Sequence, residues 1–301
     1  MRNSLLPEES FEVLGHLTPK ISISPFGQGS KVSANKPANQ SPLLDPKYWL
    51  DNGDDITYLK SGRAALHQAL IEIGLTKNAS VMIVTTSGGR YVSACVTDTI
   101  EKICRWSHDY DNMTSAILII HEFGFPCNIP QKLIDMKLPI IEDCAYAIGT
   151  RIEGGGVGEI GDYALYSFSK YFPIPYGGIL VSQKRNHEKT PNGRLWLTEE
   201  GENFLKCQLE NVESKCKDWN EIRKNNWDYF CSNLSPFGLI PFFPSNPKNI
   251  PGVFVFKFPK NMIMKGPILK DALIKRGIEC TVYYTMWSCY NLTDTLRRHM
   301  L

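Results

Sequence analysis

A lysine that follows a strand-like run is the first residue that could carry out chemistry. The run Tyr166-Ser167-Phe168-Ser169 leads into Lys170, and Gly177-Gly178 stands close behind. A lysine just past a strand end can form a Schiff base with an aldehyde cofactor. The hydroxyl of Ser167, three residues earlier, can hold a phosphate group. The commoner role of a lysine, a solvated surface charge, is the alternative.

An acid at the end of a second strand-like run supplies a partner for such a cofactor. Asp143 ends the apolar run that begins at Ile140, and Tyr146 follows three residues later. A buried carboxylate needs a partner, because leaving it unpaired is costly. A protonated pyridine nitrogen is one such partner, and it turns the ring of pyridoxal 5'-phosphate (PLP) into an electron sink. A helix N-cap or a structural ion pair would also explain the acid.

Two further segments gain meaning only from context. Ser61 to His67 is a small-residue turn that opens a helix, and free N–H groups at a helix start suit a phosphate. Many helices start with Ser-Gly, so this signal is weak alone. Gly277 to Tyr284, late in the chain, reads by itself as an ordinary strand.

One glycine pattern is misleading. Gly156 to Gly161 matches the G-x-G-x-x-G fingerprint of dinucleotide-binding proteins. That fingerprint needs a preceding strand and a following helix. Here a polar glycine-rich loop precedes the pattern and a strand follows, so we do not expect NAD to bind there.

The elements around these segments alternate between strand and helix. The predicted strands are 56–59, 81–84, 116–120, 139–143, 163–168, 178–182, 253–256 and 280–284, and the predicted helices are 65–73, 92–103, 130–136 and 267–275. Such alternation predicts a large, doubly wound, mostly parallel sheet. Ligands of these sheets bind beyond the carboxyl ends of the strands, where Asp143 lies.

The chain divides into four predicted parts. Residues 1–50 are rich in Pro, Ser and Asn and would form an extended arm, or else a flexible tail. Residues 51–195 would form the large α/β domain and 196–235 a helical connector. Residues 236–301 would form a small C-terminal α+β domain.

Bulk composition indicates an ordinary globular protein. Of the 301 residues, 43% are hydrophobic and 21% charged, and the formal net charge is +2. That balance gives no support for a nucleic-acid partner. We expect no membrane span and no signal peptide. Nine cysteines without a C-x-x-C pair predict reduced thiols in a cytoplasm, with no disulfide framework and no metal site.

Taken in order, the motifs resemble the DegT/DnrJ/StrS family of sugar aminotransferases. The family's Ser-Gly-Thr-Ala-Ala-Leu-His helix start corresponds to 61–67, its His-x-Tyr-Gly-x-Pro turn to 121–126, and its Glu-Asp-x-Ala-x-Ala strand end to 140–147. Its Gly-Asp-x-x-x-Phe-Ser-Phe strand corresponds to 161–168, and its lysine and Gly-Gly pair to Lys170 and 177–178. Its Gly-Ile-x-Thr-x-x-His-Tyr segment corresponds to 277–284. The match runs from about 58 to 290. The resemblance implies the PLP-dependent transferase fold of type I.

The resemblance also implies roles for individual residues. Lys170 would carry PLP and shuttle a proton between cofactor and substrate carbons, and Asp143 would bind the pyridine nitrogen. The cofactor-binding residues would be Gly62, Arg63, Ala64, Tyr91, Asp143, Tyr146, Ser167 and Lys170. The first three would bind phosphate, mainly through backbone amides, with help from the Ser167 hydroxyl. Tyr91 would stack on the ring, or else be a core tyrosine.

Several positions depart from the family pattern. Tyr146 replaces a glutamine that contacts the 3-oxygen of the cofactor, and a tyrosine hydroxyl can make the same hydrogen bond. Arg63 replaces a small hydroxyl residue and can clamp a phosphate or a carboxylate. Lys170 follows Ser167 by three residues instead of five, and Tyr283 replaces a late histidine. The family's Asn-x-Arg loop has only a poor counterpart at 192–194.

The expected function is PLP-dependent transfer of an amino group, from a donor such as glutamate, to a keto group of a nucleotide-linked sugar. Surface-polysaccharide or antibiotic-sugar synthesis would use the product, and the family's two-subunit site implies a homodimer. Two alternatives stay open. One is a PLP enzyme of the same fold acting on an amino acid or other amine, motivated by Arg63. The other is a shortened, non-catalytic relative that serves as a binding or assembly protein.

Overall fold

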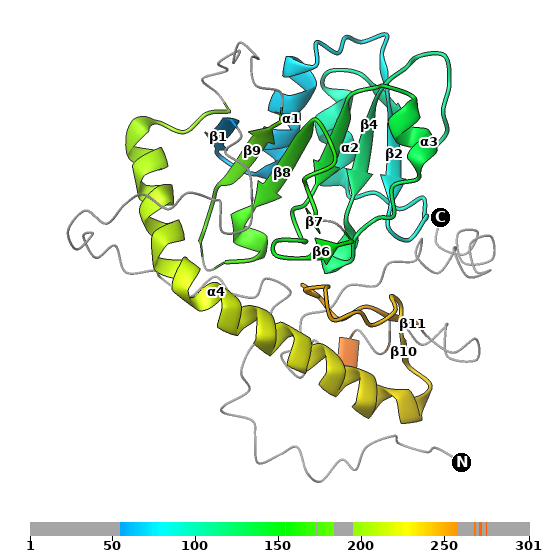
Figure 1. The fold of residues 1–301 in the computed structure, drawn as a ribbon, viewed down its shortest axis with the longest axis vertical. Helices are drawn as coiled ribbons and strands as arrows, with labels where there is room; N and C mark the ends of the chain where they lie inside the picture. The colour runs from blue at the N-terminus through cyan, green and yellow to red at the C-terminus, as the bar shows by residue number, and fades with distance from the viewer. Residues whose placement is uncertain are drawn as a thin grey trace.

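The computed structural model describes residues 55–153, 155–172, 174–183 and 195–257, together with Ile268, Asp271, Ala272 and Lys275. The helices are α1 (Gly62–Glu72), α2 (Ala94–Glu101), α3 (Gln131–Asp135) and α4 (Glu199–Leu234), with short 3-10 turns η4 (Glu122–Gly124), η5 (Phe168–Lys170) and η6 (Ser235–Phe237). The strands are β1 (Asp55–Leu59), β2 (Ser80–Thr85), β3 (Arg105–Ser107), β4 (Thr114–Ile120), β5 (Ile140–Asp143), β6 (Arg151–Ile152), β7 (Gly155–Gly156), β8 (Tyr163–Ser167), β9 (Gly178–Ser182), β10 (Ile240–Pro241) and β11 (Phe256–Lys257). Figure 1 shows their arrangement.

A seven-stranded sheet forms the centre of the described part, in the order β1-β9-β8-β5-β4-β2-β3. The pairs β8–β5, β5–β4, β4–β2 and β2–β3 are parallel. Strand β9 is antiparallel to both of its neighbours, β1 and β8. The sheet is therefore mostly parallel, as predicted, with one reversed strand.

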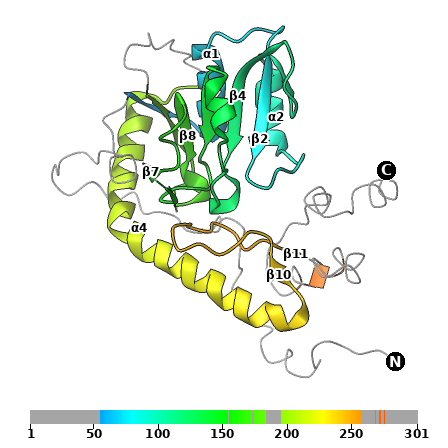
Figure 2. The same cartoon turned by 45° about the vertical axis from the view of Figure 1, so that its right-hand side comes forward.

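Helices cover both faces of this sheet. On one face, α1 and α2 pack on Val81 and Ile83 of β2 and on neighbouring strands. On the other face, α3 packs on Met82, while the first half of α4 covers β8 and β9 through Leu205 and Leu209. Figure 2 shows the sheet between these layers. The alternation of side chains along β2 gives each face its own core.

Helix boundaries follow local chemistry. Ser61 caps α1 by accepting a hydrogen bond from the Ala64 amide at 3.2 Å. Gly74, just after α1, has a φ of +79°, which is why a glycine ends this helix. Thr198 caps α4, and Glu199, Glu200 and Glu202 in its first turn suit the positive end of the helix dipole. The second half of α4 runs past the sheet beside β10 and β11 (Figure 1).

Two sequence predictions need correction. The strand predicted at 253–256 is wrong for most of its length, because only Phe256 joins a strand, the two-residue β11 that pairs with β10. Val253 and Phe254 pack instead against an aromatic cluster that includes Trp227 and Phe242. The helix predicted at 92–103 is shorter, and β3 was missed. Strand β3 has three residues at the sheet edge and no alternating pattern.

Some predictions lie outside the described residues. These are the arm at 1–50, the strand at 280–284, most of the helix at 267–275, Tyr283 and the 192–194 segment. The four-part domain division therefore stays a prediction. Within the described residues, no helix is both long enough and apolar enough to cross a membrane.

Candidate cofactor site

Asp143 lies at the carboxyl end of β5, between the parallel neighbours β4 and β8. Its side chain is buried, and Oδ1 accepts a hydrogen bond from the Ala145 amide at 2.9 Å. Among the described residues, Oδ2 has no hydrogen-bond or ion-pair partner. This hydrogen bond closes a turn, and no helix follows β5 before β6 in this described stretch, so the helix N-cap given as one alternative is wrong, and one carboxylate oxygen stays available. A protonated pyridine nitrogen fits this free oxygen.

Lys170 ends the 3-10 turn η5 that directly follows β8. Its Nζ atom lies 4.3 Å from the centroid of the Tyr146 ring. No carboxylate among the described residues pairs with this amine. Its turn is fixed by the hydrogen bond from the Phe168 amide to the Gly177 carbonyl, at 3.1 Å. The lysine is therefore held at the strand end where cofactor chemistry was predicted.

The start of α1 and the end of β8 meet closely at Gly62 and Ser167. A Cβ atom built at Gly62 would lie 2.9 Å from Cβ of Ser167, so only glycine allows this approach. The Ser167 hydroxyl and the amides of Gly62 and Arg63 have no partner among the described residues. The Ala64 amide already donates to Ser61. Three open donors at a helix start form a fitting place for a phosphate.

Tyr146 and Tyr91 belong to the same neighbourhood. Burial raises the pKa of Tyr146, and the charge of Asp143 and the nearby Cys95 and Tyr91 raise it further. Burial also raises the pKa of Tyr91, with a smaller effect from Cys95. Tyr91, Cys95, Asp143 and Tyr146 therefore lie near enough to act on one another electrostatically, and Lys170 lies over the Tyr146 ring. Sequence reasoning missed Cys95, since nothing in its local pattern marks it.

The ring of Tyr91 does not stand alone. It packs against an aromatic cluster that contains Phe123, Phe125, Trp227 and Phe242. This contact favours the core-tyrosine alternative for part of its surface. Its stacking role on a cofactor ring stays a prediction.

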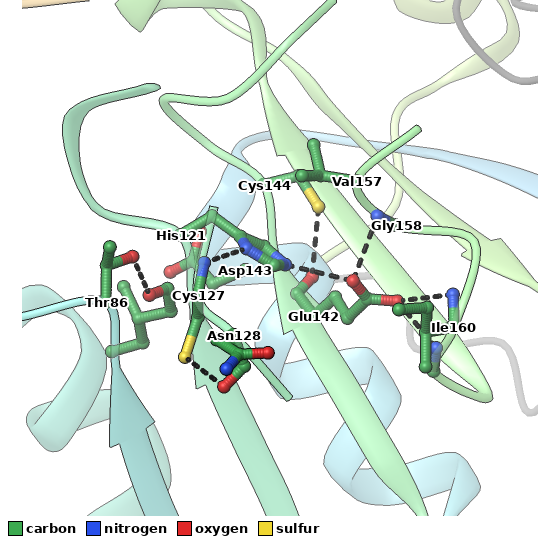
Figure 3. Close-up of polar contacts among 12 residues, drawn as sticks. Thr86, His121, Cys127, Asn128, Glu142, Asp143, Cys144, Val157, Gly158 and Ile160 are labelled. Atoms are coloured by element: carbon green, nitrogen blue, oxygen red, sulfur yellow. Dashed lines mark hydrogen bonds and ion pairs between the residues drawn. The ribbon is translucent and has the colours of Figure 1, made fainter. Parts of the chain in front are cut away.

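The glycine-rich loop at 156–161 serves an internal carboxylate (Figure 3). The amides of Gly158, Ile160 and Gly161 donate to the Glu142 side chain at 3.0, 2.8 and 2.5 Å. The pattern is followed by strand β8 and not by a helix. These amides are therefore occupied, which agrees with the expectation that a dinucleotide does not bind there.

His121, Glu142 and Cys144 form a compact buried group whose candidate ligand atoms lie within 4.8 Å of one another. However, Nδ1 of His121 accepts a hydrogen bond from the Cys127 amide at 2.9 Å, so Nε2 carries the hydrogen that faces Glu142. Neither ring nitrogen has a lone pair free for a metal. We therefore assign this group to hydrogen bonding.

Comparison with solved structures identifies the fold class. An aminotransferase, TlmJ, from Streptoalloteichus hindustanus superposes with a TM-score of 0.64 at 14% identity, covering 81% of this chain and 76% of that one. The 3-amino-5-hydroxybenzoic acid synthase also gives a TM-score of 0.64, at 16% identity over 84% and 79% of the two chains. The chain therefore has the type I fold of PLP-dependent transferases, as predicted.

Comparison of sequences adds a family match over part of the chain. Residues 108–191 match the DegT/DnrJ/EryC1/StrS aminotransferase family, which confirms the resemblance drawn from the motifs. GDP-perosamine synthase of Escherichia coli O157:H7 is 29% identical over 154 residues, 43% of this chain and 40% of the relative. A UDP-N-acetyl-3-dehydro-alpha-D-glucosamine 3-aminotransferase of Acidithiobacillus ferrooxidans is 43% identical over 193 residues, 57% of this chain and 50% of the relative. The chain thus spans half or less of these relatives' lengths. The fold and the family match indicate PLP as the cofactor.

Proposed function

We propose that this protein is a PLP-dependent aminotransferase that transfers an amino group, from a donor such as glutamate, to a keto group of a nucleotide-linked sugar. The observation that carries the proposal is the meeting of three features at adjacent strand ends. These are the lysine amine of Lys170, the free carboxylate oxygen of Asp143, and the open donors at Gly62 and Ser167.

Each feature has a role in holding the cofactor or moving a proton. The Gly62 and Arg63 amides and the Ser167 hydroxyl would bind the phosphate. Asp143 would keep the pyridine nitrogen protonated through its free oxygen. PLP, when bound, supplies the electron sink that lets a carbon–hydrogen bond next to nitrogen ionise. The Lys170 amine would then take the proton from the substrate carbon and return it to the cofactor carbon.

The substrate class is supported by the relatives. Two of them are named for nucleotide-linked sugars, one as a GDP-perosamine synthase and one as a 3-aminotransferase of a UDP-linked 3-dehydro sugar. A role in surface-polysaccharide or antibiotic-sugar synthesis follows from that class of product. We further propose a homodimer in the cytoplasm, since family sites of this kind use residues of two subunits.

A second candidate function has one specific observation behind it. Arg63 is exposed in the first turn of α1 and has no partner among the described residues. A guanidinium at the positive end of a helix favours an anion. That anion would be a substrate carboxylate if the enzyme acts on an amino acid. Half-reactions with amino acids and with keto-sugar nucleotides, followed by the cofactor's absorbance, separate the two substrates.

The first experiment tests the cofactor. The purified protein, mixed with PLP, is expected to show a yellow absorbance band that borohydride bleaches. A peptide map should then place the reduced pyridoxyl group on Lys170. The Lys170→Ala variant should show neither. A wild-type protein that stays colourless with added PLP would overturn the enzyme proposal and favour a non-catalytic binding or assembly role. A reducible adduct that persists in Lys170→Ala would move the site elsewhere.

A further inference from the structure

The amine of Lys170 has an aromatic contact with Tyr146. The Nζ atom of Lys170 lies 4.3 Å from the centroid of the Tyr146 ring, a distance typical of a cation–π interaction. Family members are expected to have a glutamine at this position, which has no π face. Tyr146 thus offers the lysine something that an amide side chain does not.

The Tyr146 ring is held in place by two neighbours. The Phe123 ring lies 5.8 Å away at an angle of 42°. A Cβ atom at Gly252 would lie 3.4 Å from Cδ1 of Tyr146, so the backbone there packs close to the ring. Phe123 and Gly252 are themselves joined, because the Gly252 amide donates to the Phe123 carbonyl at 2.8 Å. The ring is therefore a fixed platform.

The conformation of Phe123 supports this view. Its φ of 56° lies in the left-handed region, which a residue with a bulky side chain rarely adopts. Strained backbone persists where the surroundings fix it, and it gathers at functional sites. Here the strain places the Phe123 ring against Tyr146 and its carbonyl toward Gly252.

The lysine has few other partners. Among the described residues it forms no ion pair and no hydrogen bond, so the ring face is its defined contact. A lysine side chain has four rotatable bonds and loses much freedom when it is held. A cation–π contact contributes about 0.5–1 kcal/mol at an exposed site and about 2 kcal/mol when desolvated. That is enough to favour one position of the amine.

We propose that Tyr146 is a positioning residue for Lys170, acting through the face of its ring. The ring face holds the lysine amine at the carboxyl end of β8 whenever the amine is not bonded to the cofactor. The inference rests on the proposed function for its meaning, because only a PLP enzyme must keep this amine near the reacting carbon. The contact itself can be tested without any cofactor.

The test is competitive amine labelling of cofactor-free protein. Limiting acetic anhydride is added at fixed pH, and the label at each lysine is read by peptide mass spectrometry. An amine held against a ring face is shielded from the reagent on that side and reacts slowly. Loss of the ring in Tyr146→Leu and Tyr146→Gln should therefore raise the labelling rate of Lys170 about two- to fivefold, the equivalent of 0.5–1 kcal/mol. Tyr146→Phe keeps the ring and should match the wild type.

A second lysine on a tyrosine ring supplies a comparison. Lys206 lies 4.9 Å from the centroid of the Tyr58 ring and also pairs with Glu202 at 2.6 Å. Tyr58→Leu should leave the labelling of Lys170 unchanged. A general rise at all lysines in Tyr146→Leu would mark loss of the fold, in which case Tyr146→Gln, the family residue, decides.

Two results would overturn the inference. One is Lys170 labelling in Tyr146→Gln and Tyr146→Leu that stays at the wild-type rate. The other is a Tyr146→Phe variant that labels as fast as Tyr146→Leu, which would assign the effect to the hydroxyl. Absence of a reducible PLP adduct in the wild type would defeat the proposed function alone, since labelling uses no cofactor.

Discussion

The Nε2 atom of His121 lies 2.9 Å from Oε2 of Glu142, and neither side chain is exposed to solvent. His121 ends up next to Glu142 because β4 and β5 are parallel neighbours. Glu142 also accepts three backbone amides from the loop that leads into β8. One carboxylate therefore ties together β4, β5 and the loop before β8, and β8 leads to Ser167 and Lys170.

Replacement of Glu142 by glutamine should destabilise the protein. The carboxylate faces four donors, and the amide group of a glutamine would turn an N–H toward at least one of them. A buried donor left without a partner costs about 1–3 kcal/mol. We expect Glu142→Gln to lower the free energy of unfolding by about 2–4 kcal/mol, measured by urea denaturation. A variant as stable as the wild type would show that the loop does not depend on this carboxylate.

The same pair predicts a pH dependence. Burial alone would raise the pKa of Glu142, but the hydrogen bond from His121 and the amides of Gly161 and Gly158 hold it below its usual value of 4.5. The stabilisation from the carboxylate is therefore complete above about pH 4.5 and is lost as the pH falls through the folded-state pKa. The stability gap between the wild type and Glu142→Gln should narrow below pH 4.5.

The role of Glu142 could not be predicted from sequence. The segment 140–147 drew attention to Asp143, because an acid at a strand end fits a known cofactor contact. Glu142 is anchored by the amides of Gly158, Ile160 and Gly161, and backbone amides leave no trace in residue types. The glycine pattern was not expected to bind a dinucleotide, and its partner, Glu142, becomes visible only in three dimensions.

The elements were predictable where the hydrophobic pattern was strong. The central strands β2, β4, β5, β8 and β9 are buried on both faces and form short, nearly continuous apolar runs, and helix α1 has a helical apolar period; all lie where the sequence indicated. The 253–256 segment has the composition of a strand, but its side chains pack against the aromatic cluster that contains Trp227 and Phe242. Such side-chain contacts with residues distant in sequence cannot be read from the segment itself. In the candidate site, Lys170, Asp143, Ser167 and Gly62 were predicted from the order and spacing of the motifs, and their cofactor roles stay predictions. The cation–π contact of Tyr146 depends on two turns that are distant in sequence.

A second titrating group should act in the opposite direction. Burial raises the pKa of Glu122, against opposing hydrogen bonds from Ser87, whose amide donates to Oε2 at 2.6 Å. The folded protein then holds a proton that the unfolded chain has released, so stability falls as the pH rises from about 4.5 through the folded-state pKa. Glu122→Gln keeps an acceptor for Ser87 and removes the charge.

We therefore expect Glu122→Gln to gain stability relative to the wild type as the pH rises from 4.5 to 8. Thermal melts at half-unit pH steps measure this difference. A stability difference between variant and wild type that does not vary with pH would contradict the raised pKa of Glu122. If the variant instead gains stability toward acidic pH, the pKa of Glu122 is lowered in the folded state.

The approach of α1 to β8 predicts the effect of a single methyl group. In Gly62→Ala the new Cβ atom would lie 2.9 Å from Cβ of Ser167, so one element must shift. Overpacking of this kind costs about 1–3 kcal/mol. The variant should unfold at lower urea concentration and bind PLP more weakly. Adding Ser167→Gly should restore part of the stability, since it removes the opposing atom, but not the phosphate contact. A Gly62→Ala variant with wild-type stability would show that the gap is wider than described.

The free oxygen of Asp143 predicts that one substitution weakens PLP binding without affecting folding. Asn is isosteric with Asp and keeps the hydrogen bond from the Ala145 amide, so Asp143→Asn should fold normally. It cannot keep a pyridine nitrogen protonated, and a hydrogen bond to a charged group contributes about 1.5–3 kcal/mol. PLP should therefore bind about 10- to 150-fold more weakly, measured by titration of the absorbance band. The borohydride-reducible adduct should still form on Lys170 at high PLP, while amino transfer is lost.

Asp109→Asn is the matched control, because Asp109 is a surface carboxylate paired with Arg90. This variant should change neither PLP affinity nor amino transfer. Wild-type affinity and turnover in Asp143→Asn would place the pyridine nitrogen against another group.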